Sequence, residues 1–122
     1  MWQHWCKKWT YREKERRKEN VKGGIGPIDF KEIVSSKQLS SKIKMLSTLT
    51  YPKGSGIGYH THVGESEAVV IIKGKGIVND DGNEYEVNVG DVNVCFENHY
   101  HSIRNESDED LQIVALVIEK DN

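Results

Sequence analysis

Short β-type segments recur from residue 28 to the end of the chain, and this pattern constrains the fold more than any other feature. The segments are rich in β-branched and apolar residues, and turn signals separate them every ~8–12 residues. After Gly26 no helical periodicity interrupts them. A chain of 122 residues has the length of one domain. The pattern therefore predicts an all-β fold, an antiparallel sandwich or barrel.

The predicted strands are bounded by identifiable turns. A strand over residues 43–51 ends at Pro52-Lys53-Gly54, and residues 67–73 contain an apolar run that indicates burial on both faces. The Asp81-Gly82 pair is typical of a tight hairpin turn. In the strand that follows it, apolar residues alternate with polar ones, which predicts one buried face formed by Tyr85, Val87 and Val89. Residues 92–96 and 111–118 are two further predicted strands.

The first 24 residues differ from the rest. They hold eight basic and three acidic side chains, a local charge of +5, so that the remaining 98 residues carry −7 of the total of −2. All three tryptophans, at positions 2, 5 and 9, would share one face of a helix if this leader is helical. Residues 10–22 are polar and indicate a solvated helix or an irregular arm. A glycine-rich stretch at residues 23–27 then breaks any regular element, so we expect an N-terminal arm over residues 1–27 and a barrel domain over residues 28–122.

Charge and composition exclude several classes of protein. The near-balanced net charge of −2 and the acidic body argue against a nucleic-acid-binding protein. The sequence has no apolar run long enough to span a membrane, and Lys7, Lys8 and Arg12 interrupt any signal-peptide core. Two cysteines, Cys6 and Cys95, are too few for a disulfide framework. We expect a cytoplasmic protein with no nucleic-acid or membrane partner.

Four of the five histidines form two i, i+2 pairs, His60 with His62 and His99 with His101. On a strand this spacing directs both rings to the same face. Two imidazoles inside a barrel each need a partner, and a divalent metal ion satisfies both. Glu67 opens the next predicted strand, where its carboxylate can face the same interior. One His-x-His pair alone is a weak signal, because surface pairs are common.

These residues resemble the cupin superfamily. The segment from Gly54 to Gly74 matches every fixed position of the first cupin motif, G-x5-H-x-H-x4-E-x6-G. The second motif, G-x5-P-x-G-x2-H-x3-N, falls on Gly90, Phe96, Asn98, His101 and Asn105. Phe96 replaces its proline and Asn98 its inner glycine, the second change being mild because asparagine tolerates a left-handed backbone. The resemblance covers residues 40–118 and is to small single-domain bacterial cupins.

The resemblance implies a double-stranded β-helix, the cupin jelly-roll barrel, with a metal site inside it. It implies His60, His62, Glu67 and His101 as the ligands, selecting His101 over His99 and Glu67 over Glu65. His99 stays open as an entrance residue or a further ligand. Three imidazoles and a carboxylate suit Fe, Mn, Ni, Zn or Cu, and the donor set does not choose among these ions.

The reaction is less constrained than the site. One hypothesis is an enzyme that acts on a small oxygenated metabolite, a sugar or a carboxylate, by Lewis-acid or dioxygen chemistry. The alternative is a metal-containing binding or sensing module without turnover; a cavity plugged by Phe96 or other aromatic side chains would favour it. Proton-transfer groups are not identified, since the candidates Tyr59, Cys95, Tyr100 and Arg104 each have a packing or rim interpretation.

The leader suggests how the chain associates. Small cupins similar to this one pair through barrel faces and exchange N-terminal segments, which implies a homodimer in which the arm contacts the partner barrel. The +5 leader and the −7 body complement each other, which favours docking on a barrel over binding a polyanion.

Overall fold

The computed structural model describes residues 15–121, whose regular secondary structure consists of β-strands and one 3-10 turn. The elements in chain order are β1 (Arg16–Glu19), a 3-10 turn η1 (Val21–Gly23), β2 (Pro27–Glu32), β3 (Ile43–Tyr51), β4 (His60–Thr61), β5 (Glu65–Lys73), β6 (Lys75–Asp80), β7 (Asn83–Asn88), β8 (Val92–Cys95), β9 (Tyr100–Arg104) and β10 (Leu111–Glu119). The predicted all-β fold is confirmed. Within the described range, no helix is long and apolar enough to cross a membrane.

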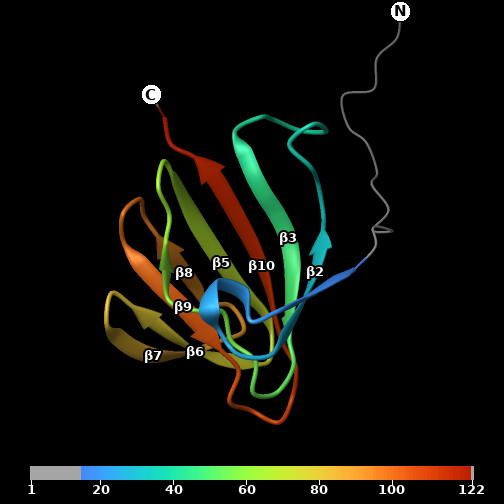
Figure 1. Cartoon of the computed structure of the whole chain (residues 1–122), viewed down its shortest axis with the longest axis vertical. Coiled ribbons are helices and arrows are strands. Elements are labelled where there is room, and N and C mark those ends of the chain that lie inside the picture. Colours follow the sequence, from blue (N-terminus) through green and yellow to red (C-terminus); the bar gives the residue numbers. More distant parts are fainter. Residues whose placement is uncertain (1–14, 122) are drawn as a thin grey trace, which may run out of the picture.

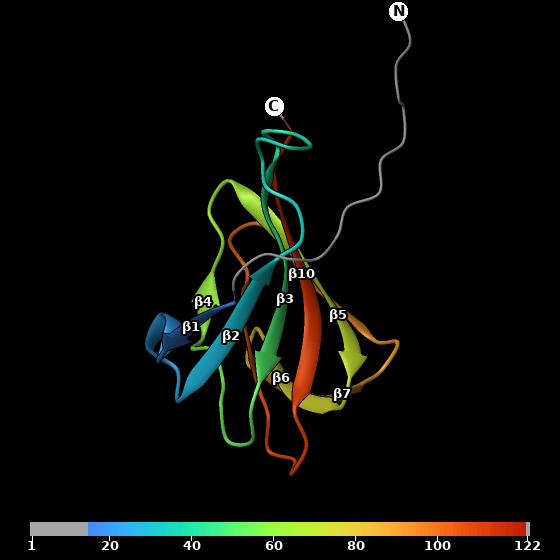
Figure 2. The ribbon, with the colours of Figure 1, turned by 90° about the vertical axis from the view of Figure 1, so that its right-hand side faces the viewer.

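Two antiparallel sheets form the walls of the barrel. The larger has the order β1-β2-β3-β10-β5-β8 and the smaller the order β4-β9-β6-β7. Figure 1 shows β6, β7 and β9 on one side of the molecule and β2, β3 and β10 on the other, and Figure 2 looks onto β2, β3, β10 and β5 side by side. Strands distant in sequence are neighbours, as where β10 lies between β3 and β5. This is the predicted double-stranded β-helix.

Alternate residues of both sheets fill the barrel. The buried set in the larger sheet includes Leu49, Val69, Ile71, Ile113 and Ala115, which share the inward-facing parity of their strands. Val78, Val87 and Ile103 of the smaller sheet pack against them. Burial of apolar side chains at ~25 cal/mol per Å² supplies the main stabilisation of such a core.

Strand boundaries follow the turn chemistry of the sequence. β3 ends at Tyr51 before Pro52, and the hairpin between β6 and β7 has positive φ at both Asp81 (49°) and Gly82 (94°), as a tight primed turn requires. Asn98 adopts a left-handed φ of 69°, so it replaces the motif glycine without changing the backbone that the turn needs.

The expected buried face of β7 was wrong in two of three positions. Val87 is buried, but Tyr85 is 40% and Val89 62% exposed. Val89 follows the end of the strand at Asn88, so strand alternation no longer applies to it. The Tyr85 hydroxyl donates to Asp80 and accepts from Asn93, which holds the ring at the barrel edge.

Part of the predicted arm belongs to the larger sheet. Residues 16–19 pair with β2 in antiparallel register, whereas the sequence suggested a solvated helix or an irregular segment there. Cross-strand partners such as Arg17 and Asp29, with Nε and Oδ1 2.7 Å apart, stabilise this polar pairing, which apolar periodicity could not reveal. The leader tryptophans lie outside the described residues.

Two glycine-rich stretches pack against each other and fix η1 on the barrel. A Cβ at Gly58 would lie 1.9 Å from the carbonyl oxygen of Lys22, and one at Gly24 would lie 2.1 Å from that of Gly56. Backbone amides bond across this contact, Gly58 N to Val21 O at 2.9 Å among them. The glycines are therefore required because the two backbones approach so closely.

Candidate metal centre

Four ligating side chains from three strands meet inside the barrel. His60 lies on β4 and His101 on β9, directly opposite each other in the antiparallel register. His62 follows β4, and Glu67 lies on β5 of the other sheet. One ligand atom from each residue lies within 4.8 Å of all the others. The structure thus brings together the four residues that the motif resemblance implied.

The spacing of these atoms suits a metal ion. His62 Nε2 lies 3.0 Å from Glu67 Oε1 and 3.2 Å from His101 Nε2, and His101 Nε2 lies 2.8 Å from Glu67 Oε1. Adjacent ligands at right angles on an ion with bonds of ~2.1 Å are separated by ~3.0 Å. The distances among these three atoms therefore fit neighbouring positions of a six-coordinate ion, and the His60 ligand atom lies within 4.8 Å of each. The cluster is able to bind a metal.

Hydrogen bonds outside the cluster orient two of the rings. His60 Nδ1 lies 2.7 Å from the carbonyl oxygen of Gly58, and because a carbonyl only accepts, Nδ1 donates and Nε2 is left to act as a ligand. His101 Nδ1 lies 2.9 Å from Asn93 Oδ1, which accepts in the same way. Such partners fix the tautomer and the orientation of a metal-binding histidine.

Asn93 is itself held by a chain of bonds that reaches the surface. Its Nδ2 donates to the Tyr85 hydroxyl at 2.9 Å, and that hydroxyl donates to Asp80 Oδ2 at 3.1 Å. Because Tyr85 gives its only proton to Asp80, it must accept from the amide nitrogen of Asn93. The amide oxygen of Asn93 is thereby directed at His101.

The charges within the cluster favour an ionised carboxylate. Burial opposes ionisation of Glu67, but hydrogen bonds with His101 and His62 outweigh it and lower the pKa of Glu67 to about 2. The same hydrogen bond with Glu67 raises the pKa of His62. Burial lowers the pKa of His60, which favours its neutral, ligating form. At neutral pH, Glu67 therefore offers a negatively charged carboxylate oxygen as a metal ligand.

The cluster lies in a cavity of about 190 Å³. Apart from the cluster, most of the lining is apolar and includes Leu49, Tyr51, Ile57, Val69 and Ile113. A volume below the ~300 Å³ of typical ligand pockets limits the occupant to a small molecule.

Two lysines give the cavity opening a positive charge. Lys18 and Lys22 line the cavity and are exposed, so they lie where it meets solvent. The hydrogen bond with Glu67 raises the pKa of His62, and the charges of Glu65 and Lys22 act on this pKa in opposite directions. Glu67 is the sole acidic residue among the described lining residues. Lysines therefore outnumber carboxylates among the described residues that line the cavity.

The other candidates from the sequence lie outside the cluster. The His99 side chain is 61% exposed, and its Nδ1 bonds Asp81 Oδ2 at 2.5 Å. Tyr59 and Tyr100 are exposed and stack on each other, and Arg104 pairs with Glu84 and Glu106.

Cys95 and Phe96, two further residues named from the sequence, are also not part of the candidate metal cluster. Cys95 is buried, and burial raises its thiol pKa to about 11, so it is an unreactive thiol. Phe96 is 66% exposed and does not line the cavity. Phe96 therefore does not plug the cavity, whose aromatic lining residues, apart from the histidines, are Phe30 and Tyr51.

Sequence reasoning missed Asn93 and Lys22. Asn93 shares the parity of Cys95 on the strand predicted over residues 92–96, and in the structure both are buried. Lys22 had no such signal, because its place beside the cavity depends on contacts between the two glycine stretches. The motif's final asparagine, Asn105, is fully buried and ties the loop after β9 to the backbone of Tyr51 and Glu109.

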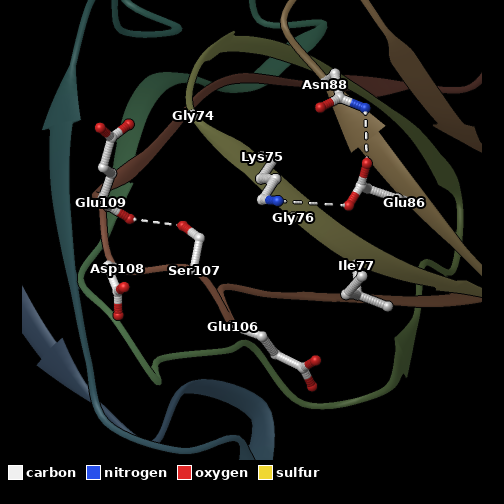
Figure 3. A pocket seen from close by; sticks show the side chains of 10 residues that line it. All are labelled: Gly74, Lys75, Gly76, Ile77, Glu86, Asn88, Glu106, Ser107, Asp108 and Glu109. Carbon is white, nitrogen blue, oxygen red and sulfur yellow. Dashed lines mark hydrogen bonds and ion pairs between the residues drawn. The ribbon is translucent and has the colours of Figure 1, made fainter.

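A larger hollow of about 690 Å³ lies elsewhere, between the β5–β6 turn, β7 and the loop before β10 (Figure 3). It shares no lining residue with the barrel cavity. Three of its four carboxylates are engaged separately, Glu86 with Lys75 and Asn88, Glu106 with Arg104, and Asp108 with Lys53. These groups do not converge on one point, so the smaller cavity is the candidate site.

Comparison with known proteins agrees with this geometry. A model of the cupin domain family matches residues 47–118, which include all four clustered residues. The chain is 31% identical over 102 residues to an oxalate-binding protein of Thermotoga maritima, with 84% of each chain covered.

Solved structures share the fold. A predicted oxalate decarboxylase from Thermotoga maritima superimposes with a TM-score of 0.88 at 29% identity, covering 92% of this chain and 100% of that one. The cupin domain of Schizosaccharomyces pombe Cnp3 has a TM-score of 0.70 at 12% identity, covering 86% of this chain and 69% of that one. The second likeness concerns the fold alone.

Proposed function

Because this chain belongs to the cupin domain family, we propose that it binds a divalent metal ion through His60, His62, Glu67 and His101 and, at that ion, a small carboxylate anion such as oxalate. The convergence of four ligand atoms in a small cavity with a cationic opening carries the proposal. The similarity to an oxalate-binding protein supports the choice of ligand. Fe, Mn, Ni, Zn and Cu are the candidate ions, as the donor types allow.

Different residues of the site would bind the metal ion, orient its ligands and attract the anion. When bound, the ion supplies a Lewis acid with open positions for ligand oxygens. Glu67 and the three imidazoles supply the donor atoms, while Gly58 and Asn93 hold two of the rings in the required tautomer. Lys22 and Lys18 attract the anion and balance the charge that remains on it. The apolar lining excludes bulk water and strengthens these interactions.

Turnover of the bound anion is a second candidate function. The similar Thermotoga maritima structure is described as a predicted oxalate decarboxylase, and hydrogenoxalate gives formate and carbon dioxide when its C–C bond breaks and its proton moves to carbon. That step needs a proton-transfer group beside the ligand. Besides the cluster, the titratable groups of the described lining are Lys18, Lys22 and Tyr51, and burial raises the pKa of Tyr51 well above its usual value. Binding without turnover therefore has the stronger support.

Calorimetric titration with oxalate tests the proposal. We expect 1:1 binding to protein reconstituted with one equivalent of Mn²⁺ and none to protein stripped by a chelator. His99→Ala serves as the matched control, since it removes a histidine outside the cluster, and should bind like the wild type. Oxalate binding that is equal with and without metal would refute the proposal. Formate release from the same samples decides between binding and turnover.

We also propose that the chain forms a homodimer to which the arm of residues 1–27 contributes. The opposite charges of leader and body support this. The mass of the full chain in solution tests it: two copies of the 13.9 kDa chain are expected, and a monomer at all concentrations would contradict it.

A further inference from the structure

One hydroxyl in the barrel cavity has no partner among the described residues. Tyr51, the last residue of β3, lines the cavity and is 1% exposed. Its main-chain carbonyl accepts from Asn105, but no described group forms a hydrogen bond with its hydroxyl. The other buried polar side chains of the described lining, Glu67, Asn93 and His101, are all bonded to neighbours. A buried polar group without a partner is rare in native proteins and requires an explanation.

The Tyr51 hydroxyl opens onto the cavity. Among the described side chains that are not exposed, Thr61 Oγ1 is the one oxygen or nitrogen that is sealed from solvent and has no partner. The Tyr51 hydroxyl has no described partner either, so it is not sealed, and the space that its side chain lines is the cavity. An occupant of the cavity can therefore reach this hydroxyl.

Tyr51 and the metal cluster lie toward opposite ends of the cavity. In the larger sheet, Tyr51 pairs with Leu111, and Glu67 pairs with Val117, six positions further along β10. Six residues of a β-strand span ~20 Å, so the two side chains enter the barrel interior from distant backbone positions. Both nevertheless line the same cavity, as does Ile113, which lies between the two rows on β10. The cavity therefore has the cluster toward one end and a hydroxyl toward the other, with apolar residues between them.

We propose that the Tyr51 hydroxyl donates a hydrogen bond to the end of the anion that is not bound to the metal ion, which makes Tyr51 a specificity-determining residue. The inference rests on the proposed function and names a second contact for the same ligand. A hydrogen bond from a neutral hydroxyl to a carboxylate is charge-assisted, and it is stronger away from bulk water. Burial and the charge of Glu67 raise the pKa of Tyr51, so the hydroxyl keeps the proton that it donates.

The contact selects a class of ligand. A small dicarboxylate has an acceptor at each end and satisfies the metal ion and the hydroxyl together. Acetate, with a methyl group in place of the second carboxylate, leaves the hydroxyl unpaired, and a site built to form a hydrogen bond rejects an analogue that lacks the partner group. A cavity of about 190 Å³ admits only a short molecule. The site should therefore prefer a short dicarboxylate to a monocarboxylate.

Calorimetric titration of Mn²⁺-loaded Tyr51→Phe with oxalate tests the inference, because this change removes the hydroxyl and keeps the ring. We expect oxalate affinity to fall about 10–100-fold relative to the wild type. Affinity for Mn²⁺ itself should stay within about twofold, since the four ligands are unchanged. Acetate, followed through the water-proton relaxation of the bound Mn²⁺, should not distinguish Tyr51→Phe from the wild type. Tyr59→Phe changes an exposed tyrosine outside the cavity and is the matched control, which should bind oxalate like the wild type.

Stability without ligand separates a binding role from a structural one. In the ligand-free protein the hydroxyl is buried without a described partner, so its removal relieves a desolvation cost. We expect Tyr51→Phe without metal or oxalate to unfold at the same temperature as the wild type or at a higher one. A structural role of the hydroxyl predicts a lower temperature.

Failure of the inference and failure of the proposed function are distinguishable. Mn²⁺-loaded wild type that does not bind oxalate would refute the proposed function and this inference with it. Oxalate affinity of Tyr51→Phe within about twofold of the wild type would refute the inference alone, leaving the hydroxyl to bond only water. An equal loss of oxalate and acetate affinity would place the contact at the metal-bound end. A lower unfolding temperature with a parallel loss of Mn²⁺ affinity would make the hydroxyl structural, and either of these last two results overturns the assignment.

Discussion

The barrel cavity and the larger hollow show what distinguishes a binding site from a depression in the surface. The hollow has more than three times the volume and four carboxylates, but three of these pair separately with neighbouring side chains (Figure 3). In the cavity, one ligand atom from each of four residues lies within 4.8 Å of the others. Convergence of donor atoms, and not volume, therefore identifies the site.

Loss of a cluster ligand should have the largest effect. His101→Ala removes one donor and leaves Glu67 without its closest partner, so we expect metal affinity to fall by more than about a hundredfold. Competition with a fluorescent zinc chelator measures this. The equivalent change in the hollow, Glu86→Gln, should leave affinity within about twofold. A similar loss in both variants would remove the distinction between the two regions.

The second largest loss of metal affinity should follow from substitution of Asn93, which accepts a hydrogen bond from His101. Asn93→Leu keeps the size of the side chain but cannot accept from His101 Nδ1, so we expect metal affinity to fall about 10–100-fold while the four ligands remain. Asn88→Leu, which removes an asparagine bonded to Glu86 in the hollow, is the control. Unchanged affinity in Asn93→Leu would show that the bond does not orient His101.

Acidification should weaken metal binding at the cavity. The hydrogen bond with Glu67 raises the pKa of His62 above 6.5, so protons already compete for this ligand near neutral pH. Below that pKa, each competing proton should lower the apparent affinity by up to about tenfold per pH unit. Glu67 stays ionised until about pH 2 and adds nothing to this range. The same chelator competition between pH 5 and 8 is the measurement, and a flat profile would contradict the role of His62.

The smallest effect should follow from the charge at the opening. Lys22→Ala should weaken oxalate binding several-fold, mainly at low salt, because the side chain is exposed and its field is screened. Lys75→Ala at the hollow should have no effect. Oxalate calorimetry in 20 and 300 mM salt separates the two variants, and equal affinities for Lys22→Ala and the wild type at low salt would exclude this lysine from binding.

The two histidine pairs show how far the sequence could predict the site. His60 and His62 both reach the cavity, as period-2 geometry requires. His99 and His101 have the same spacing, but His99 precedes β9 and follows Asn98 with its left-handed φ, so alternation does not extend to it. Motif spacing resolved this choice where periodicity could not.

The fold was predictable to a similar extent. Turn chemistry predicted the ends of β3 and the β6–β7 hairpin from local sequence. β1 and the position of Lys22 depend on contacts between distant segments, and no local pattern carries that information. The run in residues 67–73 that is apolar on both parities indicated burial on both faces of β5, which was wrong for one face: Glu67, Val69 and Ile71 are buried, but Ile72 is 44% exposed.

Metal analysis of protein purified without added metal tests the central claim most directly. By inductively coupled plasma mass spectrometry, we expect close to one equivalent of a transition metal in the wild type and in His99→Ala, and less than about a tenth of that in the His60→Ala/His62→Ala double variant. Circular dichroism of the double variant verifies that it is folded. Wild-type protein that holds no metal and takes up none on reconstitution, or a double variant that retains a full equivalent, would contradict the account.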